Sequence, residues 1–477
     1  MMLITIIAIA VYLAIMTLIG LIAMTKIKSV DDLYVGGMNI GGIVTALSFF
    51  TTYFSSVIFI GATALGWKYG LPIVWKDIFV VLIGTLGAFI ILGPRLMILS
   101  RRLGFKSVVE FIEKRYSSRL AGLTAATVMF VGLFIYCISI MVGVARAVEV
   151  VAGVSYTIAL IATITVTLVY TALGGYLGQV WTQAAQSVLM LFMAIAICIL
   201  SLIATNGLSG LHQTLSSIDP SLAGWPYRDF VPLFLLYISL GLLGWGNPAL
   251  VMRFISIRDR ISFRSATVIA TVTTVALTLS LNLASAASRA ILSEVPNPEY
   301  AFTYLVQRIF PQGFDIIFLL AVLSASMSTL TAIMGTMTHI LRDVVGLKKV
   351  FSSRNEFLFY RIVTVIIALT ATVMALQPPQ MIIVLFGVTT SILSGVLIGP
   401  IVYGLFWRRT SAIAVTIAMI ASFTSAIAVS AYGGFKFPWT YYAFGPTILL
   451  SLLIPPLISL VTKPPSREVI DRVFSKC

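Results

Sequence analysis

The chain has 477 residues, of which 59% are hydrophobic and 10% charged, and its mean hydropathy is +1.06. Soluble domains average about 25% charged residues, so this composition excludes a soluble protein and predicts an all-α integral membrane protein. The net charge of +15 does not indicate a nucleic-acid partner. Most Lys and Arg residues fall in segments that an external N-terminus would place in the cytoplasm, as the positive-inside rule requires.

A membrane-spanning helix needs roughly 20 apolar residues. Runs of this size cover residues 3–25, 41–67, 73–99, 120–147, 156–177, 184–204, 230–255, 264–290, 313–345, 357–377, 381–406, 411–432 and 440–461. We therefore expect thirteen transmembrane helices in one domain, 1–477, of the plasma membrane, with the N-terminus outside and the C-terminus cytoplasmic. The first run is expected to be a retained helix, because Lys26 and Lys28 follow it, whereas basic residues precede the apolar part of a signal peptide.

Two of these runs carry signs of interrupted helices. The run 41–67 contains "SFFTTYFSSVIFIGATALGW", rich in hydroxyl residues and glycine, and the run 230–255 contains "SLGLLGWGNPALVMRF" with Pro248. Glycine and proline can simply pack or kink membrane helices. Interruptions at corresponding places in two halves, however, indicate the central site of a transporter. We therefore expect an inverted repeat of five helices, 41–204 and 230–406, preceded by the extra helix 3–25 and followed by two C-terminal helices, 411–461.

A cluster of hydroxyl groups lies in "LLAVLSASMSTLTAIMG", residues 319–335. Ala325, Ser328 and Thr329 stand at i, i+3 and i+4 and share one helix face. Two hydroxyls and a tilted carbonyl, together with carbonyls of the interrupted segment from Thr51 to Phe54, would suit a small hard cation. The alternative is that the hydroxyls bond to carbonyls of their own helix and only aid packing.

The sequence does not indicate an enzyme. The only histidines, His212 and His339, are far apart in the sequence, and nearly all carboxylates lie in loops or at the ends of apolar runs. We therefore predict no catalytic residue and no metal site other than one for an alkali cation.

Five segments in order carry a family resemblance. They are "RRLGFKSVVEFIEKRYSSRLAGL" (101–123), "YTALGGYLGQVWTQAAQSVLM" (170–190), "GNPALVMRFISIRD" (246–259), "SASMSTLT" (324–331) and "GPIVYGLFWRRTS" (399–411). They resemble the sodium:solute symporter family, and the likeness extends over nearly the whole chain. The resemblance implies an inverted-repeat fold, sodium as the coupling ion and a small organic solute as the transported partner, in a lipid bilayer, with no obligate protein partner.

The resemblance also implies residues for the ion. The family's sodium site, transferred position by position, consists of the carbonyls of Thr51, Phe54 and Ala325 with the hydroxyls of Ser328 and Thr329.

For the solute, "TTYFSSVIFIG" (51–61) and "ARAVE" (145–149) look most like the pantothenate branch, and "ARAVE" is also similar to the proline branch. Both solutes carry a carboxylate, which Arg146 could bind through its forked guanidinium, unless it only pairs with Glu149. A relative that transports sialic acid has a substrate-contacting arginine at the place of Tyr136. The predicted solute-binding residues are Ser55, Ser56, Tyr136, Trp245 and Arg146.

Two positions depart from the family pattern. Proline transporters carry an essential Asp where this chain has Tyr53, and many members carry Asp where it has Gln183. The predicted function is a sodium-coupled symporter that imports a small carboxylate, such as pantothenate, proline or a monocarboxylate, by alternating access. A proton-coupled transporter is the first alternative, disfavoured because no acid lies in the middle of a run. A solute-sensing receptor is the second, disfavoured because only a short segment follows the last run.

Overall fold

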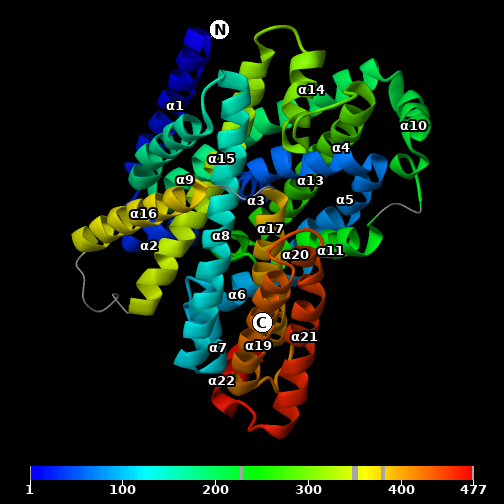
Figure 1. The fold of residues 1–477 in the computed structure, drawn as a ribbon. Coiled ribbons are helices and arrows are strands. Elements are labelled where there is room, and N and C mark those ends of the chain that lie inside the picture. The colour runs from blue at the N-terminus through cyan, green and yellow to red at the C-terminus, as the bar shows by residue number, and fades with distance from the viewer. Residues whose placement is uncertain (1, 226–228, 346–352, 378–381, 475–477) are drawn as a thin grey trace.

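The computed structural model describes residues 2–225, 229–345, 353–377 and 382–474. Within these ranges the protein is helical, and the only β-type pairing is an isolated parallel bridge between Ile40 and Ile257. The prediction of an all-α membrane protein is confirmed (Figure 1).

The helices of the N-terminal half are α1 (Met2–Met24), α2 (Val30–Val35), η1 (Gly36–Met38), α3 (Gly42–Tyr53), η2 (Val57–Ala62), α4 (Thr63–Tyr69), η3 (Leu71–Trp75), α5 (Lys76–Ile78), η4 (Phe79–Leu92), α6 (Gly93–Leu103), α7 (Val108–Tyr116), α8 (Arg119–Ala152), α9 (Tyr156–Ala204), α10 (Gly207–Ile218) and η5 (Pro220–Leu222). Those of the C-terminal half are α11 (Phe230–Gly246), α12 (Pro248–Ser256), α13 (Arg260–Ile291), η6 (Pro298–Tyr300), α14 (Ala301–Ile309), α15 (Phe314–Val345), α16 (Ser353–Ala375), α17 (Ile382–Thr390), η8 (Ser391–Val396), α18 (Ile398–Phe406), α19 (Ala412–Tyr432), α20 (Trp439–Tyr442), α21 (Phe444–Val461) and α22 (Arg467–Phe474).

The predicted count of thirteen spans is not confirmed. In the described ranges, 11 helices are long and apolar enough to cross a membrane, and the bent pair around residue 54 makes 12. The run 156–177 is the first part of α9, in which only Tyr156–Thr165 stands out as a shorter apolar helix. At Gly175 the φ of 52° and ψ of −164° are not helical, and this kink separates the run from the next span, Gly175–Ala204. A side chain there would be strained, and its Cβ would lie 2.8 Å from Leu33 Cδ1.

Both expected interruptions are present. Helix α3 ends at Tyr53, and the two segments on either side of residues 54–56 differ in direction by 53°. Helix α11 ends at Gly246, and Asn247, with φ −71° and ψ 113°, separates it from α12. Pro248 occupies the first position of α12, where its missing N–H costs no hydrogen bond. The Ile40 N–H donates to Ser256 O at 3.1 Å and so joins the segment before α3 to the end of α12.

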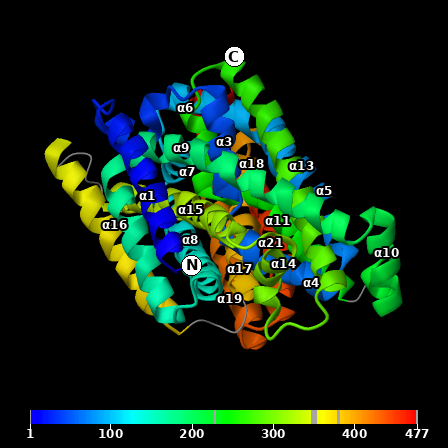
Figure 2. The ribbon, with the colours of Figure 1, turned by 90° about the horizontal axis from the view of Figure 1, so that it is seen from above.

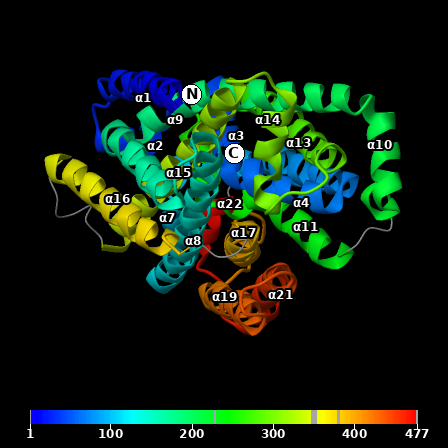
Figure 3. The same cartoon turned by 45° about the horizontal axis from the view of Figure 1, so that its top comes forward.

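The centre of the bundle contains α3, α8, α15 and α17, while α1, α16 and the pair α19 and α21 lie at its edges (Figures 1, 2 and 3). The spans of α15 and α17–α18 are almost wholly buried, whereas those of α1, α16 and α21 bury only a minority of their residues. The exposed large apolar side chains belong largely to these outer helices, and include Ile4, Ile366 and Leu457. An apolar exterior of this extent requires a lipid environment.

Candidate functional site: a cation cradle and an adjoining cavity

The break after α3 frees backbone carbonyl groups inside the protein. Phe54 is extended, with φ −113° and ψ 105°, and the N–H of Ile58 donates to Ser55 O at 2.9 Å instead of to the carbonyl of Phe54. The Ser55 hydroxyl accepts from the Val57 N–H at 3.2 Å and caps the segment that follows. The chain thus turns sharply while its carbonyls remain available for other partners.

Four oxygen atoms meet where this break faces α15. The Ser328 hydroxyl lies 3.1 Å from Thr51 O and 2.9 Å from Ala325 O. The Thr329 hydroxyl lies 3.0 Å from each of the same two carbonyls. All four residues are fully buried. We call Thr51 O, Ala325 O, Ser328 Oγ and Thr329 Oγ1 the cradle.

The chemistry of the cradle suits a small monovalent cation. Its oxygens are uncharged, and the described residues contain no group of three His, Cys, Asp or Glu side chains that could hold a metal ion. Rotation of the two hydroxyls would point their lone pairs, in place of their hydrogens, at the space between the oxygens. Phe54 lies at the break three residues beyond Thr51, and its carbonyl is not an acceptor for either hydroxyl. The bonds to Ala325 O are those expected from packing alone, but the contacts with Thr51 O join two separate helices.

A buried guanidinium lies behind the cradle. Gln183 of α9 donates from Nε2 to Ser328 O at 2.7 Å, and its Oε1 accepts from Arg253 Nη2 at 3.0 Å. Arg253 is 1% exposed, and its guanidinium lies 4.9 Å from the ring centre of Tyr176. The same Nη2 also donates to the Thr52 hydroxyl at 3.1 Å. Gln183 therefore lies beside the positive charge of Arg253, a residue that the sequence did not indicate as part of any site.

A cavity adjoins the other side of the break. Tyr53, Phe54 and Ile58 form one wall, and the other walls come from α5, η4, α11, α13 and α17. Most of the lining is apolar; the polar exceptions include Lys76, Thr278 and Asn282. The cavity is narrow in this structure, so a bound solute would require its walls to move apart.

Of the predicted solute-binding residues, Ser55 and Ser56 lie at the break and Tyr136 of α8 contacts it. The Tyr136 hydroxyl donates to Ser55 Oγ at 3.3 Å, and its ring packs against Phe386, a cavity residue, at 5.1 Å between centroids. The Ser56 hydroxyl donates to Ile140 O at 3.0 Å and attaches the break to α8. The fourth, Trp245, donates from its indole to Ile83 O at 2.8 Å, which joins α11 to η4. None of these four residues lines the cavity itself.

Arg146, the fifth predicted solute residue, is engaged elsewhere. Its Nη1 lies 3.4 Å from Glu149 Oε2 and donates to the Tyr300 hydroxyl at 3.0 Å. The neighbouring Glu299 is buried, and burial raises the pKa of its carboxyl to about 7, although a hydrogen bond from the Ile382 N–H and the charge of Arg146 oppose this shift. Arg146 is therefore part of a polar cluster that joins α8 to η6.

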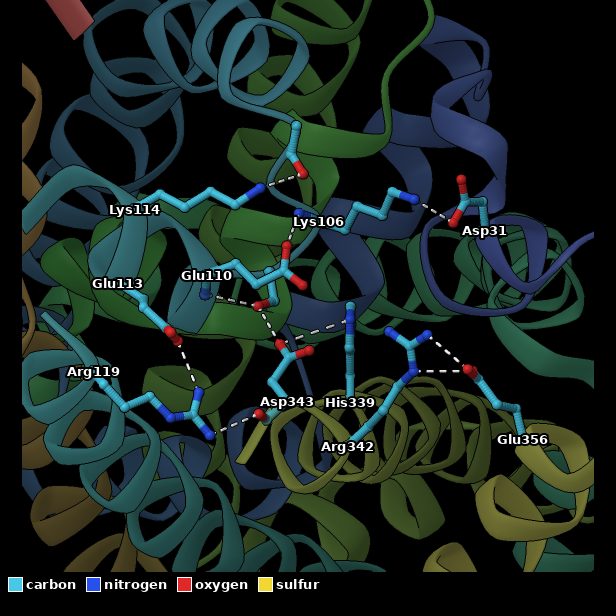
Figure 4. A network of polar contacts seen from close by, with 12 residues as sticks. Asp31, Lys106, Glu110, Glu113, Lys114, Arg119, His339, Arg342, Asp343 and Glu356 are labelled. Atoms are coloured by element: carbon cyan, nitrogen blue, oxygen red, sulfur yellow. Dashed lines mark hydrogen bonds and ion pairs between the residues drawn. The ribbon is translucent and has the colours of Figure 1, made fainter. Parts of the chain in front are cut away.

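A larger polar network surrounds the C-terminal end of α15 (Figure 4). Arg342 binds Glu356 of α16 through two hydrogen bonds of 2.9 and 3.0 Å. Asp343 accepts from the Ser107 hydroxyl at 2.5 Å, and its backbone carbonyl accepts from Arg119 at 3.2 Å. These contacts fix α15 to α16, to the start of α7 and to α8, at the end predicted to be cytoplasmic.

Sequence reasoning missed Lys76, Asn282 and Arg253. The signal in the sequence was a charged or amide side chain within or beside an apolar run. The pattern of residues in a run does not show that two such side chains, from distant runs, meet at the same cavity.

The matching family model, "Sodium:solute symporter family", covers residues 33–422. The sodium/pantothenate symporter of Escherichia coli (strain K12) is 30% identical over 434 residues, which cover 86% of this chain and 87% of that protein. The osmoregulated proline transporter of Bacillus subtilis (strain 168) is 25% identical over 97% of this chain and 96% of its own length.

A solved structure of a sodium-coupled sialic acid symporter, in a substrate-bound outward-open state, has the same fold. Its TM-score is 0.82 at 17% sequence identity, over 97% of this chain and 98% of that one. The homologues are transporters and not enzymes, in agreement with the sequence prediction. The chain therefore belongs to the sodium:solute symporter family.

Proposed function

We propose that the protein imports a small organic carboxylate, such as pantothenate, proline or a monocarboxylate, and that one sodium ion bound in the cradle drives this import. The observation that carries the proposal is the meeting of Thr51 O and Ala325 O with the hydroxyls of Ser328 and Thr329 at the break of α3. Phe54, at the break itself, would supply a fifth oxygen.

The cradle and the cavity share the segment that must move. Thr51 contributes an oxygen to the cradle, and Tyr53 and Phe54 form a wall of the cavity. A sodium ion that fixes this break would also fix one wall of the solute site. Coupling between two ligands requires such a shared element, whose state each ligand biases.

The energetics of this coupling are sufficient. One sodium ion that crosses a potential of about 100 mV releases roughly 2.3 kcal/mol. A tenfold sodium gradient adds about 1.4 kcal/mol. For a zwitterion such as proline, the total of roughly 3.7 kcal/mol supports accumulation of several hundredfold. A monoanion such as pantothenate enters against the potential, so the electrical contribution cancels and the sodium gradient supports about tenfold accumulation. In this proposal the protein lies in the plasma membrane with its N-terminus outside and its C-terminus in the cytoplasm, its repeats span 41–204 and 230–406, and it needs no protein partner.

Uptake of radiolabelled pantothenate and proline into proteoliposomes tests this function. We expect accumulation with an inward sodium gradient, and none when potassium replaces sodium. Accumulation driven by an acidic exterior without sodium would instead support proton coupling. Sodium-dependent binding without accumulation would support a solute-sensing receptor.

A further inference from the structure

Lys76, at the start of α5, is a buried cation in an otherwise largely apolar cavity. Its side chain is 2% exposed, and it is the only charged residue among those that line the cavity in the described structure. The apolar lining includes Leu240, Leu243 and Leu281. An ammonium group in such surroundings is costly unless a partner compensates its charge.

The described residues compensate Lys76 only in part. Its Nζ donates to Asn282 Oδ1 at 2.6 Å, and no ion pair joins it to a carboxylate. Asn282 in turn donates from Nδ2 to Asp77 Oδ1 at 2.5 Å, so the amide stands between the ammonium and the nearest acid. An ammonium group has three donors. One is used here, and Asp77 is not part of the cavity lining.

We propose, as an extension of the sodium-coupled carboxylate uptake proposed above, that Lys76 binds the carboxylate of the transported solute and thereby selects small carboxylates over their neutral analogues. A carboxylate of the solute supplies a negative charge in direct contact with Nζ, which Asp77 does not, and acceptors for the two remaining N–H groups. The apolar walls accommodate the hydrocarbon part of the solute. Thr278 and Asn282 also line the cavity, and the donor and acceptor capacity that their present hydrogen bonds leave would serve a hydroxyl or amide group of the solute.

A purely structural role for Lys76 makes a different prediction. If Lys76 serves only to neutralise Asp77 through Asn282, then loss of either charge should damage the protein equally and without regard to the charge of the solute. If Lys76 binds the solute, only its own replacement abolishes the preference for carboxylates.

The experiment measures thermal stabilisation of the purified full-length protein, in sodium, by three matched pairs: pantothenate and pantothenyl alcohol, lactate and lactamide, propionate and propionamide. In the unmodified protein we expect at least one carboxylate to stabilise the fold at concentrations at which its neutral partner does not. Lys76→Met should weaken binding of that carboxylate about 10- to 100-fold, the effect of a hydrogen bond to a charged group, and should leave stabilisation by sodium alone unchanged.

Three further variants serve as controls for the role of Lys76. Lys76→Arg keeps the positive charge and should keep the preference for carboxylates. Asp77→Asn should keep it as well. The double variant K76M/D77N removes both charges together, and should lose the preference even if Lys76→Met alone does not fold.

If K76M or K76M/D77N retains the preference for carboxylates, the assignment of Lys76 is wrong. It is also wrong if D77N loses this preference. Two results with the unmodified protein would also overturn the assignment. In the first, neutral compounds stabilise the protein as well as the carboxylates do. In the second, sodium stabilises the protein but none of the six compounds does. A protein that sodium does not stabilise and that transports no solute with sodium would instead refute the proposed function itself.

Discussion

Replacement of both Ser328 and Thr329 by Ala is the sharpest perturbation of the cradle. It removes two of the five proposed sodium ligands and leaves the carbonyls of Thr51 and Ala325 in place. Alanine has a high helix propensity, so α15 itself should not be weakened by the change. We expect the sodium concentration for half-maximal uptake to rise at least tenfold while the protein remains folded.

The magnitude follows from the contacts. Interactions of a charge with a hydrogen-bonding group contribute about 1.5–3 kcal/mol each in a protein interior. Loss of one ligand at the low end of this range raises the half-saturating concentration about tenfold, and loss of two independent ligands raises it about 100-fold. The variant also removes both hydroxyls within hydrogen-bond distance of Thr51 O, and an unsatisfied buried acceptor costs about 1–3 kcal/mol of stability.

The assay is initial uptake into proteoliposomes as external sodium is varied at constant ionic strength. Ser326→Ala is the matched control, because the Ser326 hydroxyl donates to Val322 O within α15, at 2.8 Å, and does not contact α3. The control should keep the sodium dependence of the unmodified protein. An unchanged sodium dependence in the double variant would mean that the two hydroxyls serve only in packing.

Further predictions concern charge near the two sites. One sodium ion should accompany each solute, with a Hill coefficient near one for sodium activation, because Arg253 beside Gln183 disfavours a second cation. Two sodium ions counted per solute would refute this. In the variant Gln183→Asp the new carboxylate should pair with Arg253, so the count should remain one. Burial raises the pKa of Glu299 to about 7, so the folded state holds more protons than the unfolded chain between about pH 5 and 7, and stability should fall by up to about 3 kcal/mol as pH rises through this window. Glu299→Gln should remove most of this fall in thermal unfolding measured in detergent, and an unchanged pH profile would contradict the assignment. Arg146→Gln should reduce uptake of carboxylates and of neutral analogues equally, and a selective loss of carboxylates would place Arg146 in the solute site.

The sequence was sufficient to predict the elements whose patterns are local. Apolar runs predicted the helices, and hydroxyl groups, glycine and Pro248 predicted both interruptions. The spacing of Ser328 and Thr329 placed both hydroxyls on one face of α15, and the structure brings that face to Thr51. The alternative of bonds within the helix is also realised, because the same two hydroxyls donate to Ala325 O.

Contacts between distant segments could not be predicted in the same way. Lys76 and Asn282 are separated by 206 positions in the chain, and only the packing of α5 against α13 brings them together. Gln183 departs from the family pattern, and only the structure shows that its amide oxygen accepts a hydrogen bond from Arg253. The count of thirteen spans stays a prediction, since the kink at Gly175 divides α9 and, of the part before it, only Tyr156–Thr165 is recognised as a shorter apolar helix.

Entry of radiolabelled sodium into proteoliposomes, measured with and without external pantothenate or proline, tests the central claim most directly. The account predicts that a transported solute stimulates sodium entry in the unmodified protein and in Ser326→Ala. In the variant that lacks the hydroxyls of Ser328 and Thr329, this stimulation should be lost at the same sodium concentration. Solute uptake without any stimulated sodium entry, or equal stimulation in the variant without the two hydroxyls, would contradict sodium coupling through the cradle.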